Sequence, residues 1–216
     1  MMSQGLALSD DGRLRCQWAR VSARDQDYHD LEWGEPVTGD AELLERISLE
    51  GFQAGLSWAT VLAKRPAFRE VFCGFDPERV AQFTPSTVEA LMADARIIRH
   101  RGKIEAVIQN ARATLAIRET HGSLLTLMAP VFQEALENPR PADWETLRAR
   151  AHTPESTKLS KLLKGQGFRF IGPTGAYAML QAIGVVNDHV EGCWCRGRTE
   201  RSRQQWAAIL LETRGA

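Results

Sequence analysis

Apolar positions along most of this chain recur every three or four residues, which is the spacing of one face of an α-helix. Residues 41–52, AELLERISLEGF, carry such a face. Residues 103–122, KIEAVIQNARATLAIRETHG, carry a longer one that ends at a glycine. The alternation typical of a half-buried strand is scarce. The pattern therefore predicts an all-α fold.

Residues that favour helix ends refine this prediction. Asp40 can cap the helix 41–52, and Thr84 and Thr153 each precede a proline that suits the first helical position. Pro66 can open a separate helix with the sequence PAFREVF. Further helices are predicted at 56–65, 85–94, 154–167, 173–184 and 202–212, with a connector at 136–145.

The two ends of the chain are less regular than its middle, which suggests that they combine into one structural unit. A length of 216 residues suffices for one domain with two lobes around a cleft. We predict a single domain over 1–216. Its parts are a helical lobe at about 40–125, a second lobe made of about 14–39 plus 126–200, and a C-terminal helix or tail at 201–216.

Charge and composition exclude several protein classes. Lys and Arg total 27 and so do Asp and Glu, so the chain is not a generally basic nucleic-acid binder, although a local basic patch is allowed. No apolar run reaches the length of a membrane span, and the N-terminal MMSQGLALSDDGRLR lacks the apolar core of a signal peptide. We expect a cytoplasmic protein with no membrane partner.

The segment 188–195, DHVEGCWC, resembles half of a metal site. His189 and Cys193 stand at H-x3-C spacing, and Cys16 and His29 offer a second pair at C-x12-H. Zinc prefers four nitrogen or sulfur ligands in a tetrahedron. A site built from both pairs would join the two ends of the chain, and its metal would stabilise a lobe that has little core of its own.

The spacing leaves other ligands open. Cys195 competes with Cys193, while Cys73 and three further histidines stand apart from both pairs. With all four positions filled by protein atoms, no open position remains for metal-bound water. A zinc-dependent hydrolase is therefore excluded if the four ligands are correct.

Five segments of the chain share a further pattern: R15-C-Q-W18, Y28-H-D-L-E-W-G34, L49-E-G-F-Q-A-G-L-S-W58, D94-A-R-I-I-R-H-R-G-K103 and V186-N-D-H-V-E-G-C193. Together they resemble the DNA-3-methyladenine glycosylase I family. They extend over about residues 15–195. The resemblance implies a helix-hairpin-helix glycosylase fold whose second lobe holds one structural zinc. It places the ligands on Cys16, His29, His189 and Cys193, and it leaves Cys195 out.

The resemblance also implies a pocket for a flipped, positively charged base. Aromatic faces attract a cation, and a buried carboxylate can pair with it and accept a proton from its amine. By resemblance, Glu50 binds the base edge, Tyr28 and Trp58 stack on it, and Trp33 and Trp18 line the pocket. Glu50 would stabilise the departing base, with water as the nucleophile. A role for Glu50 as general base stays open.

The segment 97–103, IIRHRGK, is the expected DNA contact. A hairpin between helices exposes backbone N–H groups, and basic side chains add phosphate contacts. A solvated basic turn is an equally good interpretation of this segment from sequence alone. Lys103 can be structural or phosphate-binding. By resemblance, Gly55 and Leu56 fill the gap that the flipped base leaves. The predicted DNA-binding residues are Gly55, Leu56, Arg99, His100, Arg101, Gly102 and Lys103.

The expected activity is hydrolytic excision of 3-methyladenine from alkylated double-stranded DNA by a monomer, without strand cleavage. Two alternatives are a glycosylase for other N3-alkylated purines and a non-catalytic DNA-binding homologue. Three departures from the family pattern bear on this: Phe52 at the expected pocket edge, Arg96 before the hairpin, and the divergent segment 123–140.

Overall fold

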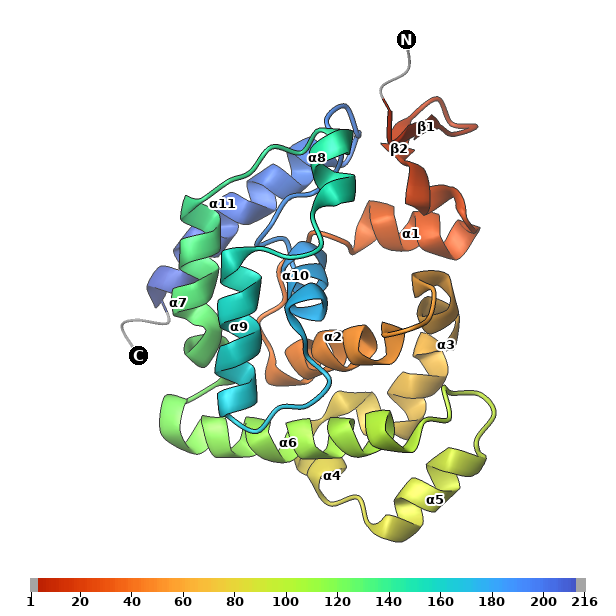
Figure 1. Ribbon diagram of the computed structural model, residues 1–216, viewed down its shortest axis with the longest axis vertical. Helices are drawn as coiled ribbons and strands as arrows, with labels where there is room; N and C mark the ends of the chain where they lie inside the picture. The colour runs from red at the N-terminus through yellow and green to blue at the C-terminus, as the bar shows by residue number, and fades with distance from the viewer. Residues whose placement is uncertain (1–3, 213–216) are drawn as a thin grey trace.

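The computed structural model describes residues 4–212, and its helices confirm the all-α prediction (Figure 1). The α-helices are α1 (Ala23–Leu31), α2 (Asp40–Gln53), α3 (Trp58–Val71), α4 (Pro77–Ala81), α5 (Pro85–Ala93), α6 (Arg101–His121), α7 (Leu124–Glu137), α8 (Trp144–Ala149), α9 (Pro154–Gly165), α10 (Pro173–Ala182) and α11 (Arg196–Glu212). Two short 3₁₀-helices are η1 (Gln17–Arg20) and η2 (Cys73–Phe75). The last four residues of the predicted tail lie outside the described residues.

A small β-hairpin near the N-terminus was not predicted. Strands β1 (Leu6–Leu8) and β2 (Leu14–Cys16) pair antiparallel, with Leu6 opposite Cys16. Each strand has three residues, which is too short to show an alternating pattern. The backbone N–H of Trp194 also donates to the carbonyl of Leu14, at 2.9 Å. The hairpin therefore fixes Cys16 against the C-terminal part of the chain.

Side-chain caps explain where most helices begin. The hydroxyl groups of Thr84 and Thr153 accept hydrogen bonds from the third residue of α5 and α9, so both predicted starts are confirmed. The cap predicted at Asp40 is wrong, because Gly39 occupies that position and Asp40 is the first helical residue. Its carboxylate instead accepts the backbone N–H of Leu124 at 2.8 Å and pairs with Arg118. Asp40 thus ties α2 to α6 and α7.

The predicted break at Pro66 is wrong, since α3 runs through this residue without interruption. Proline removes one helix hydrogen bond and crowds the preceding turn. Leu62 and Phe68, on either side of it, are buried in the core. Tertiary packing therefore keeps the helix continuous where local propensity favours two.

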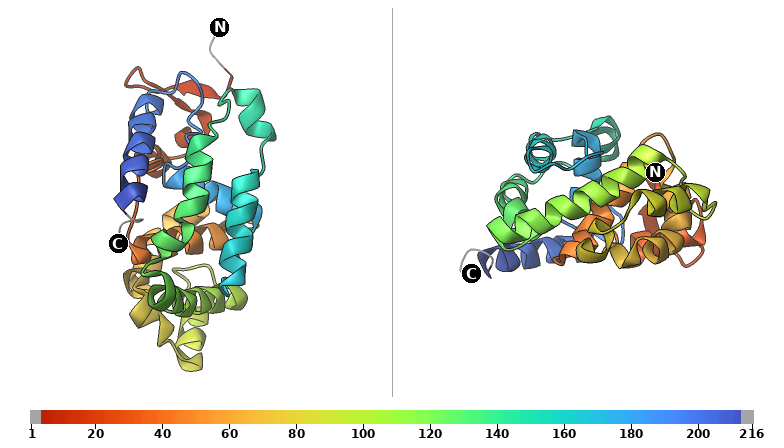
Figure 2. Two further views of the ribbon diagram at one scale, coloured as in Figure 1. Left: turned by 90° about the vertical axis from the view of Figure 1, so that its left-hand side faces the viewer. Right: turned by 90° about the horizontal axis from the view of Figure 1, so that it is seen from below.

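One large apolar core holds the helices together. Helix α2 lies at the centre and packs against α3, α6, α7 and α10, while α9 and α11 pack on the flank formed by α7 (Figures 1 and 2). None of the helices within residues 4–212 is long and apolar enough to cross a membrane.

Two of the three departures from the family pattern, Phe52 and the segment 123–140, belong to this core. Phe52 is fully buried, with its ring 4.3 Å from that of Phe68, so the expectation that it changes contacts at the pocket edge is wrong. Most of the divergent segment 123–140 forms α7, whose apolar face packs in the same core. The buried residues of 124–186 thus continue the core of 43–117, and the unit around the cysteines is smaller than the predicted second lobe.

Candidate metal centre and adjoining pocket

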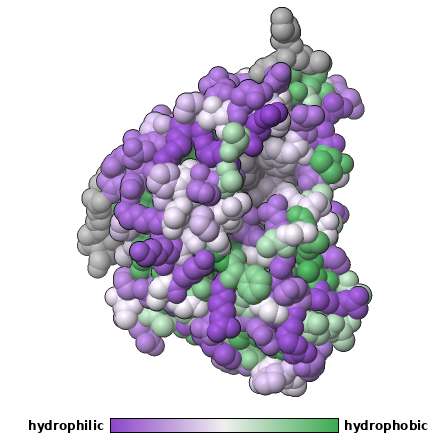
Figure 3. All heavy atoms as spheres, viewed as in Figure 1, coloured by the Kyte–Doolittle hydropathy of each residue, from purple (hydrophilic) through white to green (hydrophobic). Residues whose placement is uncertain are grey.

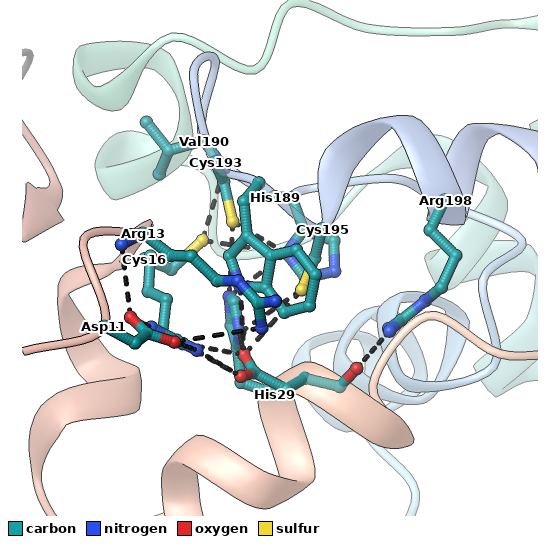
Figure 4. Close-up of polar contacts among 12 residues, drawn as sticks. Asp11, Arg13, Cys16, His29, His189, Val190, Cys193, Cys195 and Arg198 are labelled. Carbon is teal, nitrogen blue, oxygen red and sulfur yellow. Dashed lines mark hydrogen bonds and ion pairs between the residues drawn. The ribbon is translucent and has the colours of Figure 1, made fainter. Parts of the chain in front are cut away.

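Four side chains from the two ends of the chain meet in one buried cluster, which we call the Cys/His cluster: Cys16, His29, His189 and Cys193. Strand β2 supplies Cys16 and helix α1 supplies His29, while the loop before α11 supplies the other two (Figure 4). Their ligand atoms all lie within 4.8 Å of one another. The spacing argument proposed this same set of residues.

The distances in the Cys/His cluster suit a tetrahedral zinc ion. The Nδ1 of His189 lies 3.2 Å from the Nε2 of His29, and the sulfur of Cys193 lies 3.4 Å from each of these nitrogens. The sulfur of Cys16 lies 3.9 Å from the Nδ1 of His189. Zinc bonds of about 2.1 Å to nitrogen and about 2.3 Å to sulfur give ligand–ligand edges of roughly 3.3–3.8 Å. The donor set and its spacing therefore fit the metal.

A buried ion pair orients the first histidine. The Nδ1 of His29 lies 2.8 Å from Asp30, whose carboxylate also accepts hydrogen bonds of 2.7–3.0 Å from Arg15. Burial alone would raise the pKa of Asp30, but the hydrogen bonds from Arg15 and His29 hold it below its usual value. A carboxylate behind a histidine fixes the ring and makes its free nitrogen a better ligand.

Cys193 and Cys195 lie in different surroundings. Hydrogen bonds from Cys16 and Cys195 hold the pKa of Cys193 far below its ordinary value. Burial opposes this shift, and hydrogen bonds from the two histidines add to it. Thiolate is the form that binds zinc. Cys195 lies on the other side of His29, 3.7 Å from Nδ1 and 3.8 Å from Asp30. The structure thus places Cys193, and not Cys195, among the four candidate ligands.

An aromatic wall connects the Cys/His cluster to a neighbouring pocket. Trp33 stacks on His29, and Trp18 meets the edges of both rings at 5.0–5.3 Å. Tyr28 follows, 6.4 Å from Trp18 and 5.2 Å from Trp58. The four aromatic residues predicted for the base pocket therefore lie together. Because Tyr28 and His29 are consecutive in α1, fixing the histidine also fixes the tyrosine.

The pocket has a volume of about 310 Å³ and opens between α1, α2, α8 and α10. Figure 3 shows the molecule hollowed in this region, on the face seen in Figure 1. The predicted lining residues are Trp18, Tyr28, Trp33, Glu50 and Trp58. The remaining lining residues were not predicted: Gln53, Trp144, Leu147, Arg148, Ala178, Gln181, Asp188 and Val190.

Glu50 is the unusual group in the pocket. It is 8% exposed, and no hydrogen bond or ion pair within residues 4–212 engages its carboxyl group. Burial raises its pKa to about 8, and the charge of Arg46 opposes this only in part. Arg46 itself pairs with Glu32. An unpaired acid in an aromatic pocket is suited to a cationic ligand with an N–H donor.

A second carboxylate, Asp188, is satisfied by the protein. It accepts hydrogen bonds from Tyr177, from Gln181 at 2.7 Å and from Arg150 at 3.4 Å. These contacts hold the segment that carries His189. The signal that could have pointed to Asp188 is its position beside the predicted ligand.

The segment predicted to contact DNA connects α5 to α6. His100 caps α6 by accepting a hydrogen bond from the backbone of Lys103 at 3.2 Å, and Arg99 is exposed beside it. Arg101 is exposed and pairs with Glu89 at 2.8 Å. Gly102 lies in the first turn, next to His100. This arrangement leaves basic groups and a helix N-terminus at the surface.

Lys103 has the structural role that was one of its two predicted options. It is 7% exposed, and its ammonium group donates to the carbonyls of Phe52 at 2.9 Å and Ala54 at 2.6 Å. It thereby caps the C-terminus of α2. Its inclusion among the phosphate-binding residues is wrong, because its ammonium group is buried and donates to the carbonyls at the end of α2.

Gly55 and Leu56 form the turn between α2 and α3. Gly55 has φ +83°, a conformation that favours glycine, and Leu56 is 42% exposed. The turn therefore presents an apolar side chain at the surface between the two helices that carry Glu50 and Trp58.

A family model described as methyladenine glycosylase matches residues 18–196. The chain belongs to the methyladenine glycosylase family. DNA-3-methyladenine glycosylase 1 of Escherichia coli (strain K12) is 46% identical over 182 residues, which cover 84% of this chain and 96% of that protein. DNA-3-methyladenine glycosylase of Haemophilus influenzae is 42% identical over 183 residues, 84% of this chain and 97% of that protein.

Solved structures agree with this assignment. A crystal structure of 3-methyladenine DNA glycosylase I has a TM-score of 0.77 and 43% identity, covering 84% of this chain and 98% of that one. A Staphylococcus aureus 3-methyladenine DNA glycosylase I, whose structure concerns 3-methyladenine recognition, has a TM-score of 0.77 at 31% identity, with 84% and 96% covered. The methyladenine glycosylase fold is thus shared along most of the chain.

Proposed function

We propose that this protein is a DNA glycosylase of base-excision repair that hydrolytically releases 3-methyladenine from alkylated double-stranded DNA. The observation that carries the proposal is Glu50, a buried and unpaired acid inside an aromatic pocket. The names of the relatives, DNA-3-methyladenine glycosylases, point to the same substrate.

The pocket can recognise the base by its charge. The rings of Tyr28 and Trp58 offer faces to a cationic purine, an attraction of about 2 kcal/mol when desolvated. A bound cation also favours the ionised form of Glu50, which can then accept a hydrogen bond from the exocyclic amine. A neutral adenine has no charge to attract the rings or to favour ionised Glu50, so the pocket discriminates in favour of the methylated base.

The same charges assist bond cleavage. Water adds to C1′ of the sugar as the bond from C1′ to the base nitrogen breaks, and the base takes the electron pair and leaves as a neutral molecule. The water loses one proton to solvent or to a nearby base. Glu50 stabilises the base as it departs. Among residues 4–212, no lysine lines the pocket, and the ammonium group of Lys103 is engaged by the carbonyls of Phe52 and Ala54, so we expect no strand cleavage.

The Cys/His cluster would hold one zinc ion. The ion would supply structural stability, since four protein ligands would leave it no open position for water. The chain's own residues then pass this order to the pocket: His29 fixes Tyr28, and Trp33 stacks on His29.

DNA contact is proposed for the surface around the start of α6. Arg99 and Arg101 would bind phosphates, and the backbone N–H groups of α6 add to this in a helix-hairpin-helix arrangement. Leu56 would enter the space left by the flipped base. The monomeric state and the cytoplasmic location stay predictions.

The test is release of free base from methylated duplex DNA by wild type and Glu50→Gln, with 7-methylguanine in the same DNA as internal control. Selective release of 3-methyladenine that Glu50→Gln reduces, at unchanged zinc content, supports the proposal. Release of other N3-alkylated purines at equal rate would widen the substrate class. No release from a folded protein that binds DNA would favour the non-catalytic alternative.

A further inference from the structure

Phe170, in the loop between α9 and α10, combines two unfavourable features. Its side chain is 43% exposed although it is a large aromatic group. Its backbone has φ +54°, in the left-handed region that non-glycine residues rarely adopt. Neither feature contributes to a folded core, and strained backbone tends to persist where the surrounding structure holds it for a function.

The loop is fixed firmly around this residue. Phe168 and Ile171 are buried on either side of it. The side chain of Asn110 clamps the backbone of Arg169, accepting its N–H at 2.7 Å and donating to its carbonyl at 3.2 Å. Ser160 donates to the carbonyl of Ile171 at 2.8 Å. The backbone that carries the exposed ring is therefore held in place on both sides.

Phe170 lies between the start of α6, which is proposed to contact DNA, and the part of α2 that carries Glu50. Its ring lies 6.0 Å from that of His100, edge to face. A β-carbon on Gly102 would lie 3.5 Å from the ring, and one on Gly51, beside Glu50, would come within 3.2 Å of its carbonyl oxygen. In Figure 1 the loop between α9 and α10 runs between α2 and α6, on the face that carries the pocket opening.

Arg169 supports the same interpretation by its charge. Its side chain is exposed and forms no hydrogen bond or ion pair within the described residues, unlike Arg101 nearby. It lines a groove with Arg101 and Arg112 between α5 and α6. A free guanidinium beside an exposed ring is a combination that binds a phosphate and a nucleotide face together.

We propose that Phe170 is a DNA-contacting residue that stacks on a base exposed where the duplex opens at the lesion, with Arg169 on a neighbouring phosphate. The inference rests on the proposed function, because it takes duplex DNA as the partner. It adds a second apolar contact, from the C-terminal half of the chain, to the turn at Leu56. Because the loop is already fixed, the ring can bind with little loss of backbone freedom.

The experiment compares Phe170→Ala and Phe170→Tyr with Leu8→Ala, a control that trims an exposed apolar side chain on the distant β-hairpin. Three quantities are measured for each variant: affinity for a duplex with an abasic-site analogue, excision of 3-methyladenine from methylated duplex, and affinity for free 3-methyladenine. Thermal unfolding shows whether each variant is folded.

Loss of base stacking predicts that Phe170→Ala weakens duplex binding and excision by about 5- to 100-fold. Free-base affinity stays unchanged, and Phe170→Tyr restores both duplex readouts. An effect no larger than that of Leu8→Ala overturns the inference, and so does an equal loss in free-base affinity. If duplex binding depends on Phe170 but the protein releases no base, the proposed function is wrong and this inference is supported.

Arg169→Gln gives an independent measurement. Loss of one phosphate contact lowers the slope of log affinity against log salt concentration by about 1. Arg79→Gln, on the exposed side of α4, is the matched control and leaves the slope unchanged. An unchanged slope in Arg169→Gln would remove the arginine from the proposed contact.

Discussion

Apolar packing fills the helical core, whereas side chains that can bind a metal fill the centre of the Cys/His cluster. The core buries residues from Leu43 to Leu210 in one continuous group. Apart from cysteines, the buried apolar members of the smaller group within the described residues are Leu6 and Val190. Burial of apolar area stabilises the first region without help. The second has too little of it, and we expect its stability to depend on its ligands, on the Arg15–Asp30 pair and on the proposed zinc.

The pocket takes its residues from both regions, which are stabilised in different ways. Glu50 and Trp58 are placed by helices of the core, whereas Tyr28 and Trp33 are placed by the Cys/His cluster. Damage to either region should therefore affect catalysis, but with different signatures in stability and zinc content.

Loss of a zinc ligand should have the largest effect. We expect His29→Ala and Cys193→Ala to lose zinc and to lower excision more than about 100-fold, because the binding free energy of a structural zinc is local folding free energy. Hydrogen exchange should rise in α1 and in 187–195 and stay slow in α2 and α6. Cys195→Ser, a buried cysteine outside the four ligands, is the control and keeps its zinc. Equal exchange throughout the chain would show that the two regions unfold as one.

Removing core volume should lower the stability of the whole fold without loss of zinc. Phe68 is fully buried among aromatic rings, so Phe68→Ala should lower the free energy of unfolding by about 3–5 kcal/mol. Folded protein should still contain one equivalent of zinc. Urea denaturation and metal analysis check this, and loss of zinc at low urea would break the distinction between the regions.

Glu50→Gln should lower excision by about 100-fold or more while it stabilises the protein. The folded state keeps the proton on Glu50 up to about pH 8, and the unfolded state releases it near pH 4.5. Folding therefore takes up a proton between these values, and the stability of the wild type falls as pH rises through that range. The variant should be the more stable protein at pH 8 and equal to wild type near pH 4.5.

The pH profile of activity sharpens this test. The kcat/KM of the wild type should rise as Glu50 ionises and level off above about pH 8, since the substrate is a cation. In Glu50→Gln this rise should be absent. A wild-type rate that is flat from pH 5 to 9 would argue against an ionised Glu50 in recognition.

The smallest expected effect is that of Asp30→Asn. The residue orients His29 from outside the Cys/His cluster, so zinc affinity should fall by about 10- to 100-fold while the core keeps its stability. Competition with a chelator measures the affinity. An unchanged value would mean that Arg15 and Asp30 stabilise the fold without acting on the ligand.

The sequence by itself determined the features that depend on local chemistry. Helix periodicity and the Thr84 and Thr153 caps placed most of the helices, because they act over a few neighbouring residues. Rare residues at typical ligand spacing pointed to the Cys/His cluster, and the resemblance named its members and Glu50.

Only the tertiary structure decided the features that depend on distant partners. Pro66 stays inside a helix and Phe52 faces the core because of packing, and Lys103 is turned to the carbonyls that end α2. Trp144 and Gln181 line the pocket, although nothing in the predicted connector 136–145 or the predicted helix 173–184 pointed to the pocket. The exposed ring of Phe170 became visible only in the fold, because contacts with Asn110 and Ser160 on other helices hold its loop in place.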